Sequence, residues 1–130
     1  MPTIPSDFRC VQSPDVPPPA GHYSQAVVHG GLVFVSGLLP FTDAERRLGT
    51  IEEQTEIVLR HLERILAEAG SSLDRVIKVS VFVSDVKDWA AVNTVYARVF
   101  GEHKPARVVV PVPGRHYGAG IELEAVAAVS

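Results

Sequence analysis

The chain has 130 residues and a formal charge of −3 at pH 7, with a sequence pI near 5.9. This length fits one domain over residues 1–130, and the acidic balance excludes the basic surface that nucleic acids or anionic membranes require. Cys10 is the only cysteine, so no intramolecular disulfide can form, and the start "MPTIPSDFRC" has no signal-peptide pattern. We therefore expect a cytoplasmic protein whose partners are small molecules or copies of itself.

The first predicted elements are a hairpin and a helix. In "YSQAVVHGGLVFVSG" two β-rich runs are separated by Gly30 and Gly31, which predicts two antiparallel strands. Thr50 and Glu53 have capping-box spacing, and Gly70 is a C-terminal stop signal. The apolar stripe between them predicts an amphipathic helix, and it consists of Ile51, Thr55, Val58, Leu62, Ile65 and Ala69.

The second half of the chain predicts a strand, a helix and two further strands. The run "RVIKVSVFVSD" alternates as a strand, and "DWAAVNTVYARVFG" has helical spacing with Asp88 as N-cap and Gly101 as its end. The runs "PARVVVPV" and "GIELEAVAAVS" then predict a long C-terminal hairpin. The predicted order is β-β-α-β-α-β-β, with a possible extra strand around "DFRCV".

Two amphipathic helices and five or six strands predict an α+β fold, a two-layer sandwich with both helices on one face of the sheet. The other face stays uncovered. We expect it to carry Ser80, Phe82, Glu122 and Glu124, a set too apolar for comfortable exposure to water. The sequence therefore predicts self-association through this face.

Glu122 and Glu124 stand out because they share one face of an otherwise apolar strand. On the predicted hairpin, Arg107 begins the strand that pairs with theirs, so we expect it to be the partner of Glu122. An arginine fork can also hold the carboxylate of a ligand. An ordinary cross-strand ion pair of little energetic consequence is an equally weighted alternative.

The remaining polar candidates are individually ambiguous. Tyr23, Gln25, Ser36, Gly37 and Asn93 adjoin apolar runs, and each taken alone is more often structural. The histidines show no ligand spacing, so we assign no metal. Motifs for nucleotide binding and for a serine-hydrolase elbow are absent from the sequence.

Taken together, the segments "GHYSQAV", "VFVSG", "VSVFVSDVKDWAAVN", "PAR" and "IELEAVA" resemble the RidA (YjgF) family of imine and enamine deaminases. The resemblance runs from Tyr23 to Val126, and its signature is an arginine fifteen positions before a glutamate of the last strand. It implies a chorismate-mutase-like fold with a mixed sheet. It also implies a homotrimer with sites in the clefts between subunits.

By this resemblance, Arg107 binds the substrate carboxylate and Glu122 activates a water molecule. Tyr23, Ser36, Gly37 and Asn93 match pocket positions, while Val109 replaces a common pocket cysteine. His116 and Tyr117 replace a leucine-proline turn near the mouth, where they would select a larger or more acidic substrate. The implied reaction is cofactor-free hydrolysis of a 2-imino or 2-enamino acid, such as 2-aminoacrylate, to a 2-oxo acid and ammonia.

Three alternatives remain open from the sequence. A 2-aminomuconate-type deaminase of aromatic degradation would be favoured by a second basic group in the cleft, Arg115 or His116. A non-catalytic module would bind 2-oxo acids in the Arg107 cleft without turnover. The ribonuclease label sometimes attached to the family is poorly supported, because the chain is acidic and has no aromatic-basic stripe.

Overall fold

The computed structural model describes residues 1–114 and 116–130. Its secondary structure follows the predicted order and includes the extra N-terminal strand. The strands are β1 (Arg9–Val11), β2 (Ala26–His29), β3 (Leu32–Leu38), β4 (Val76–Val83), β5 (Ala106–Pro111) and β6 (Ile121–Ala128). The helices are α1 (Ile51–Glu68) and α2 (Trp89–Phe100), with short 3₁₀ turns at Leu73–Arg75, Val86–Asp88 and His116–Gly118.

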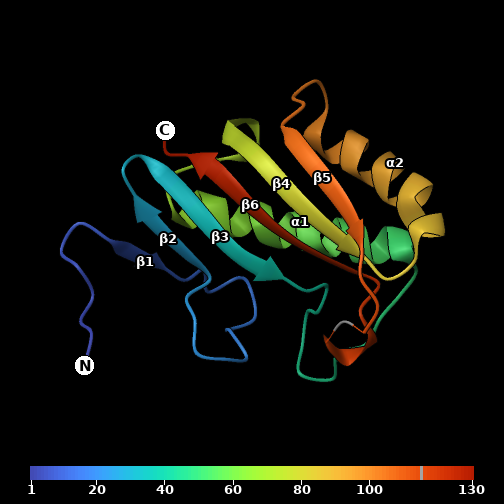
Figure 1. The fold of residues 1–130 in the computed structure, drawn as a ribbon, viewed down its shortest axis with the longest axis horizontal. Coiled ribbons are helices and arrows are strands. Elements are labelled where there is room, and N and C mark those ends of the chain that lie inside the picture. The colour runs from blue at the N-terminus through green and yellow to red at the C-terminus, as the bar shows by residue number, and fades with distance from the viewer. Residues whose placement is uncertain (115) are drawn as a thin grey trace.

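The strands form one mixed six-stranded sheet in the order β1-β2-β3-β6-β4-β5. β6 lies antiparallel between β3 and β4, and β5 pairs in parallel with β4 at the edge (Figure 1). The predicted C-terminal hairpin is therefore wrong. The chain between β5 and β6 is not a tight turn, and β6 crosses to the centre of the sheet, where its apolar face gains two neighbours.

Local sequence signals explain the boundaries of the other elements. Gly30 and Gly31 both have positive φ, as the tight turn between β2 and β3 requires. α1 begins with the complete Thr50–Glu53 capping box. It ends in a Schellman motif, in which Gly70 donates to the Ala67 carbonyl and Ser71 to the Leu66 carbonyl. Asp88 occupies the N-cap position of α2 but makes no capping hydrogen bond.

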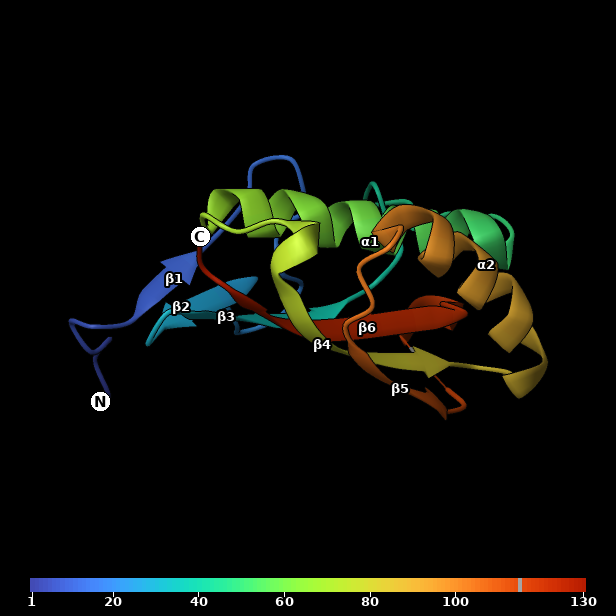
Figure 2. The ribbon, with the colours of Figure 1, turned by 90° about the horizontal axis from the view of Figure 1, so that it is seen from above.

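Both helices pack on the same face of the sheet, as predicted (Figure 2). The core between the two layers includes Val58, Leu62 and Ile65 of α1 and the inward residues of the central strands, such as Val79, Val81 and Leu123. No helix among residues 1–114 and 116–130 has the length and apolar character needed to cross a bilayer.

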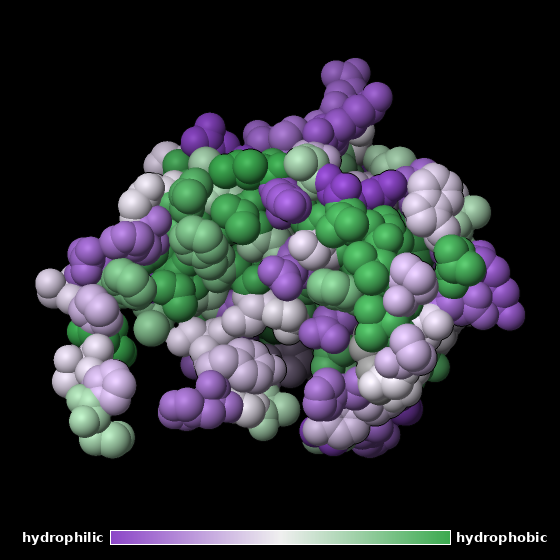
Figure 3. All heavy atoms as spheres, in the orientation of Figure 1, coloured by the Kyte–Doolittle hydropathy of each residue, from purple (hydrophilic) through white to green (hydrophobic). Residues whose placement is uncertain are grey.

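The opposite face of the sheet is uncovered in the single chain. Pairing places Glu122 opposite Phe82 and Glu124 opposite Ser80 on this face, as expected. Phe34 and Val108 are also exposed there, at 46% and 43%. Figure 3 shows hydrophobic residues gathered over this face with isolated polar ones among them. Its composition resembles an interface more than a solvated surface.

Candidate active site

The Arg107 side chain lies between β5 and α2, on the helix-covered side of the sheet. Its Nη1 donates to Oδ1 of Asn93 at 3.0 Å. The guanidinium carbon lies 4.7 Å from the ring centroid of Tyr96 and 5.9 Å from that of Trp89. The spacing 89, 93, 96 puts all three partners on one side of α2. Asn93 thus fixes one edge of the guanidinium while the two rings lie beside it.

Arg107 has only neutral partners among the described residues. No ion pair of the described chain includes it, and the side chain is only partly exposed. Burial raises the pKa of the neighbouring Tyr96 hydroxyl to about 12, so this group is also uncharged at neutral pH. A partly buried cation without a counter-ion is costly, and an anionic ligand would compensate it.

Glu122 lies at the start of β6, where its carboxylate touches the backbone of Gly37 in β3. The β3–β6 register shifts between Val35 and Leu38, so Ser36 and Gly37 form a bulge. A Cβ built on Gly37 would clash with Oε2 of Glu122 and lie 3.4 Å from its Cδ. Gly37 does not have positive φ, so glycine is required here for space. These two predicted site residues therefore lie in direct contact.

Arg107 and Glu122 do not meet within one chain. Their strands are not neighbours, because β4 lies between β5 and β6. Arg107 pairs with Val79 and Glu122 with Phe82, which places them about 10 Å apart along the strands and about 10 Å apart across them. They also lie on opposite faces of the sheet. The predicted cross-strand ion pair is therefore wrong. The error arose from the predicted C-terminal hairpin, which paired β5 with β6.

The other predicted residues divide between these two places. Val109 lies on the same side of β5 as Arg107 and packs against the core. Ser36 precedes Gly37 and therefore lies near Glu122. Its hydroxyl donates to the Ser24 carbonyl at 2.6 Å and its N–H to the Gln25 carbonyl at 2.9 Å. Tyr23 is 51% exposed and lies near the same place. His116 is exposed beside Tyr117, with ring centroids 6.0 Å apart.

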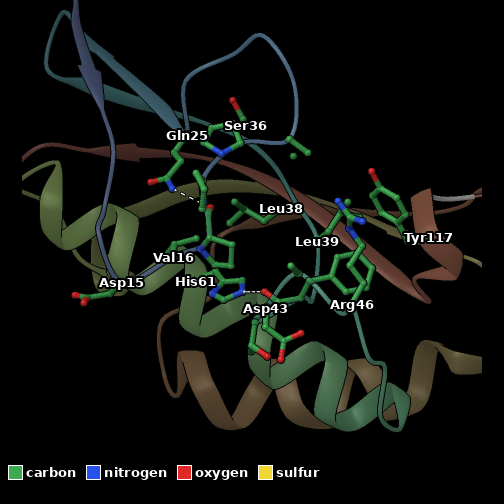
Figure 4. Close-up of a pocket in the computed structure, with 18 of the residues that line it drawn as sticks. Asp15, Val16, Gln25, Ser36, Leu38, Leu39, Asp43, Arg46, His61 and Tyr117 are labelled. Atoms are coloured by element: carbon green, nitrogen blue, oxygen red, sulfur yellow. Dashed lines mark hydrogen bonds between the residues drawn. The ribbon is translucent and has the colours of Figure 1, made fainter.

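A cavity of about 620 Å³ opens beside Ser36 and Gly37 (Figure 4). The segment before β2 and the loop between β3 and α1 form its walls. Its apolar lining comes from Val16, Pro17, Pro18, Leu38, Leu39 and Phe41, and its polar lining includes Gln25 and His61. At one side the Arg46 guanidinium stacks on the Tyr117 ring at 3.7 Å. Gly37 is therefore shared by the cavity wall and the Glu122 contact.

His61 is a buried polar residue of this cavity that the sequence did not single out. It is 3% exposed, and its Nε2 lies 2.7 Å from the Phe41 carbonyl oxygen. Because that oxygen can only accept, Nε2 carries the proton, and Nδ1 has no hydrogen-bond partner in the described chain. Burial lowers the pKa of His61 below its usual value. The imidazole is therefore neutral at pH 7 and anchors the loop after β3.

Several other residues of the candidate site were also missed. Trp89 and Tyr96 read as apolar positions of a helix, although their spacing from Asn93 was a usable signal. Arg46 has no motif around it and reaches the cavity through tertiary structure alone.

No cluster of metal-ligating side chains occurs in the part of the chain that the structure describes. Arg115, invoked for a dicarboxylate substrate, lies outside the described residues.

Comparisons with known proteins agree with this architecture. The protein-family model described as "Endoribonuclease L-PSP" matches residues 14–129. The mitochondrial protein MMF1 of Saccharomyces cerevisiae is 43% identical over 112 residues, which cover 85% of this chain and 77% of that protein. A crystal structure of yeast Mmf1 has a TM-score of 0.91 at 40% identity and covers 95% of this chain and 99% of that one.

Two bacterial structures are similarly close. RidA from a Psychrobacter species has a TM-score of 0.88 at 33% identity, covering 93% of this chain and 99% of that one. Escherichia coli TdcF, solved with bound serine, has a TM-score of 0.88 at 31% identity, covering 94% and 99%. These matches confirm the expected chorismate-mutase-like α+β fold.

Proposed function

The chain belongs to the YjgF/RidA family, and from this premise we propose that it hydrolyses 2-imino or 2-enamino acids to 2-oxo acids and ammonia. The observation that carries the proposal is Arg107, a partly buried cation whose described partners are an amide and two aromatic rings. This environment suits a ligand carboxylate. The serine in the TdcF structure is a ligand of the same chemical kind.

The active site is formed between subunits of a homotrimer. Arg107 with Asn93 and Val109 supplies one half, and Glu122 with Gly37, Ser36 and Tyr23 supplies the other. The halves are too far apart to act together in one chain, whereas a neighbouring subunit on the uncovered sheet face brings Arg107 of one chain to Glu122 of the next. A heterologous contact of this kind closes a ring, and burial of Phe34 and Val108 stabilises it.

In the reaction, Arg107 binds the substrate carboxylate and backbone groups near Gly37 and Val109 orient the imine. Glu122 holds a water molecule against the imine carbon. The water oxygen bonds to that carbon as Glu122 accepts a proton from the water, and Glu122 passes this proton to the imine nitrogen to give a carbinolamine. In the collapse of this intermediate the hydroxyl loses its proton to Glu122, the carbonyl forms, and the carbon–nitrogen bond breaks. The departing nitrogen takes the proton from Glu122 and leaves as ammonia. Because imines already hydrolyse in water, positioning supplies much of the acceleration, and the reaction needs no cofactor.

We further propose that the protein acts in the cytoplasm, although MMF1 carries the word mitochondrial in its name. It acts on small molecules, without nucleic acid or membrane partners, in keeping with its net charge of −3. His116, exposed beside Tyr117, lies at the rim and contacts larger substrates.

The test is ammonia release from enzymatically generated 2-iminopropionate and from 2-aminomuconate, measured side by side. We expect the protein to accelerate decay of 2-iminopropionate above the uncatalysed rate without added metal or cofactor. Faster turnover of 2-aminomuconate alone would identify the dicarboxylate deaminase instead. Saturable binding of pyruvate without acceleration of either substrate would identify a 2-oxo-acid binding module and refute the proposed catalysis.

A further inference from the structure

The cavity beside Gly37 is larger than the proposed reaction on a small imine requires. At about 620 Å³ it lies within the range of pockets that enclose whole small ligands. The side chain of 2-iminopropionate is a single methyl group. The remaining space is lined mainly by apolar side chains, including Val16, Leu38 and Leu39. Such a cavity is unexplained if the substrate ends at the methyl group.

The cavity adjoins the proposed catalytic carboxylate. Gly37 lines the cavity. The Glu122 carboxylate occupies the space that a side chain at position 37 would need. Glu122 itself does not line the cavity, so a substrate whose imine carbon faces a water on Glu122 reaches the cavity with a side chain that extends past Gly37. Most polar atoms of the two buried polar side chains in the lining are already engaged. Gln25 bonds the Ser13 N–H and the Pro17 carbonyl, and His61 bonds the Phe41 carbonyl through Nε2. His61 Nδ1 is the exception, with no partner among the described residues. The space itself favours an apolar occupant.

The side of the cavity is closed by an unusual pair. Arg46 and Tyr117 have φ of 54° and 59°, and they are the non-glycine residues with positive φ in the described chain. They also contact each other, with Arg46 stacked on the Tyr117 ring (Figure 4). The rings of Phe41 and His116 lie 5.8 Å and 6.0 Å from the same ring. Strained backbone persists where surrounding structure enforces it, often at ligand clamps. The pair completes an aromatic wall.

We propose that this cavity receives the substrate side chain, so that the preferred substrates are 2-imino acids with large apolar side chains, aromatic or branched. Tyr117 and Phe41 contact the side chain, Leu39 sets its depth, and Arg46 holds Tyr117 in place. The proposal rests on the proposed function for the reaction itself. The preference for large apolar groups is a separate property of the cavity and can be measured separately.

The experiment compares imines formed by an amino-acid oxidase from phenylalanine, leucine and alanine. We expect kcat/KM to be highest for the phenylalanine or leucine imine. Leu39→Trp fills the cavity and should lower the ratio of large-imine to alanine-imine kcat/KM about tenfold or more. Ala44→Trp does so from an exposed position of the lining, so it does not disturb the core. Ile4→Trp, at a 70% exposed position outside the lining, is the matched control and should leave the ratio unchanged.

An unchanged ratio in both lining variants, or a wild-type preference for the alanine imine, would overturn the cavity proposal and leave the deaminase proposal intact. A preference for a dicarboxylic imine that is lost in Arg46→Ala would also overturn it. That result would show that Arg46 binds the second carboxylate of the substrate. If no imine is turned over, titration with phenylpyruvate and pyruvate still decides. Tighter phenylpyruvate binding, weakened by Leu39→Trp, supports the cavity, and equal binding of the two acids contradicts it.

Discussion

Arg107→Lys should lower kcat/KM for imine hydrolysis by about 100-fold or more, in a protein that folds and assembles normally. Lysine keeps the positive charge but loses the planar fork. In the native side chain one edge of that fork is held by Asn93 at 3.0 Å, and the rings of Trp89 and Tyr96 fix its plane. A flexible ammonium cannot keep both the Asn93 bond and a bidentate contact with the substrate carboxylate.

The measurement is kcat and KM for 2-iminopropionate decay, with the molar mass of the variant from light scattering. Arg98→Lys is the control, because Arg98 forms an exposed ion pair with Glu56 on the helix layer and should leave turnover unchanged. Turnover like that of the wild type in Arg107→Lys would show that Arg107 is structural, and the proposed carboxylate site would then be wrong.

Glu122→Gln should lower kcat by about 100-fold or more while largely retaining affinity for pyruvate. Glutamine preserves the shape and fits beside Gly37, but it cannot accept the proton from water. Glu124→Gln is the matched control on the same strand face. Glu124 is exposed, lies opposite Ser80, and is two residues along β6 from Glu122, the residue that contacts Gly37. This variant should therefore keep nearly all activity.

The readouts are kcat and titrated pyruvate affinity for both variants. If Glu124→Gln is the inactive protein and Glu122→Gln is active, the mechanism on Glu122 is wrong. Equal loss of turnover and of pyruvate affinity in Glu122→Gln would indicate a role in binding instead of proton transfer.

Local signals in the sequence predicted the elements well. The capping box at Thr50, the glycine pair of the β2–β3 turn and the apolar stripe of α1 each act within a few residues, so their chemistry is visible in the sequence. The sequence predicts only two amphipathic helices, which are enough to cover one face of the sheet and not both. The same count predicted the uncovered sheet face that the structure has.

Strand order was predicted less well, because it depends on contacts distant in sequence. The runs of β5 and β6 follow each other and look like a hairpin. The connection between them leads β6 to the centre of the sheet, between β3 and β4. This one error produced the incorrect Arg107–Glu122 ion pair. The family resemblance named both residues, but only the pairing of Arg107 with Val79 and of Glu122 with Phe82 shows that they lie on opposite faces.

The cavity was the part of the site hardest to predict. Its walls come from the segment before β2, the loop after β3, α1 and the 116–118 turn. His61 looked like one more scattered histidine, and Arg46 like one more charge in a polar loop. Neither has a sequence motif, since their positions follow from how these connections fold over the end of the sheet.

The most direct test of the proposed intersubunit active site is complementation between two inactive variants. Arg107→Ala and Glu122→Gln chains are mixed in equal amounts, dissociated and reassembled together, and imine hydrolysis is measured. If each site takes Arg107 from one subunit and Glu122 from its neighbour in a cyclic trimer, random mixing restores about one quarter of wild-type activity. Light scattering verifies that trimers have reassembled. If their activity stays at the level of the separate variants, the two residues do not act across a subunit boundary, and the proposed active site is wrong.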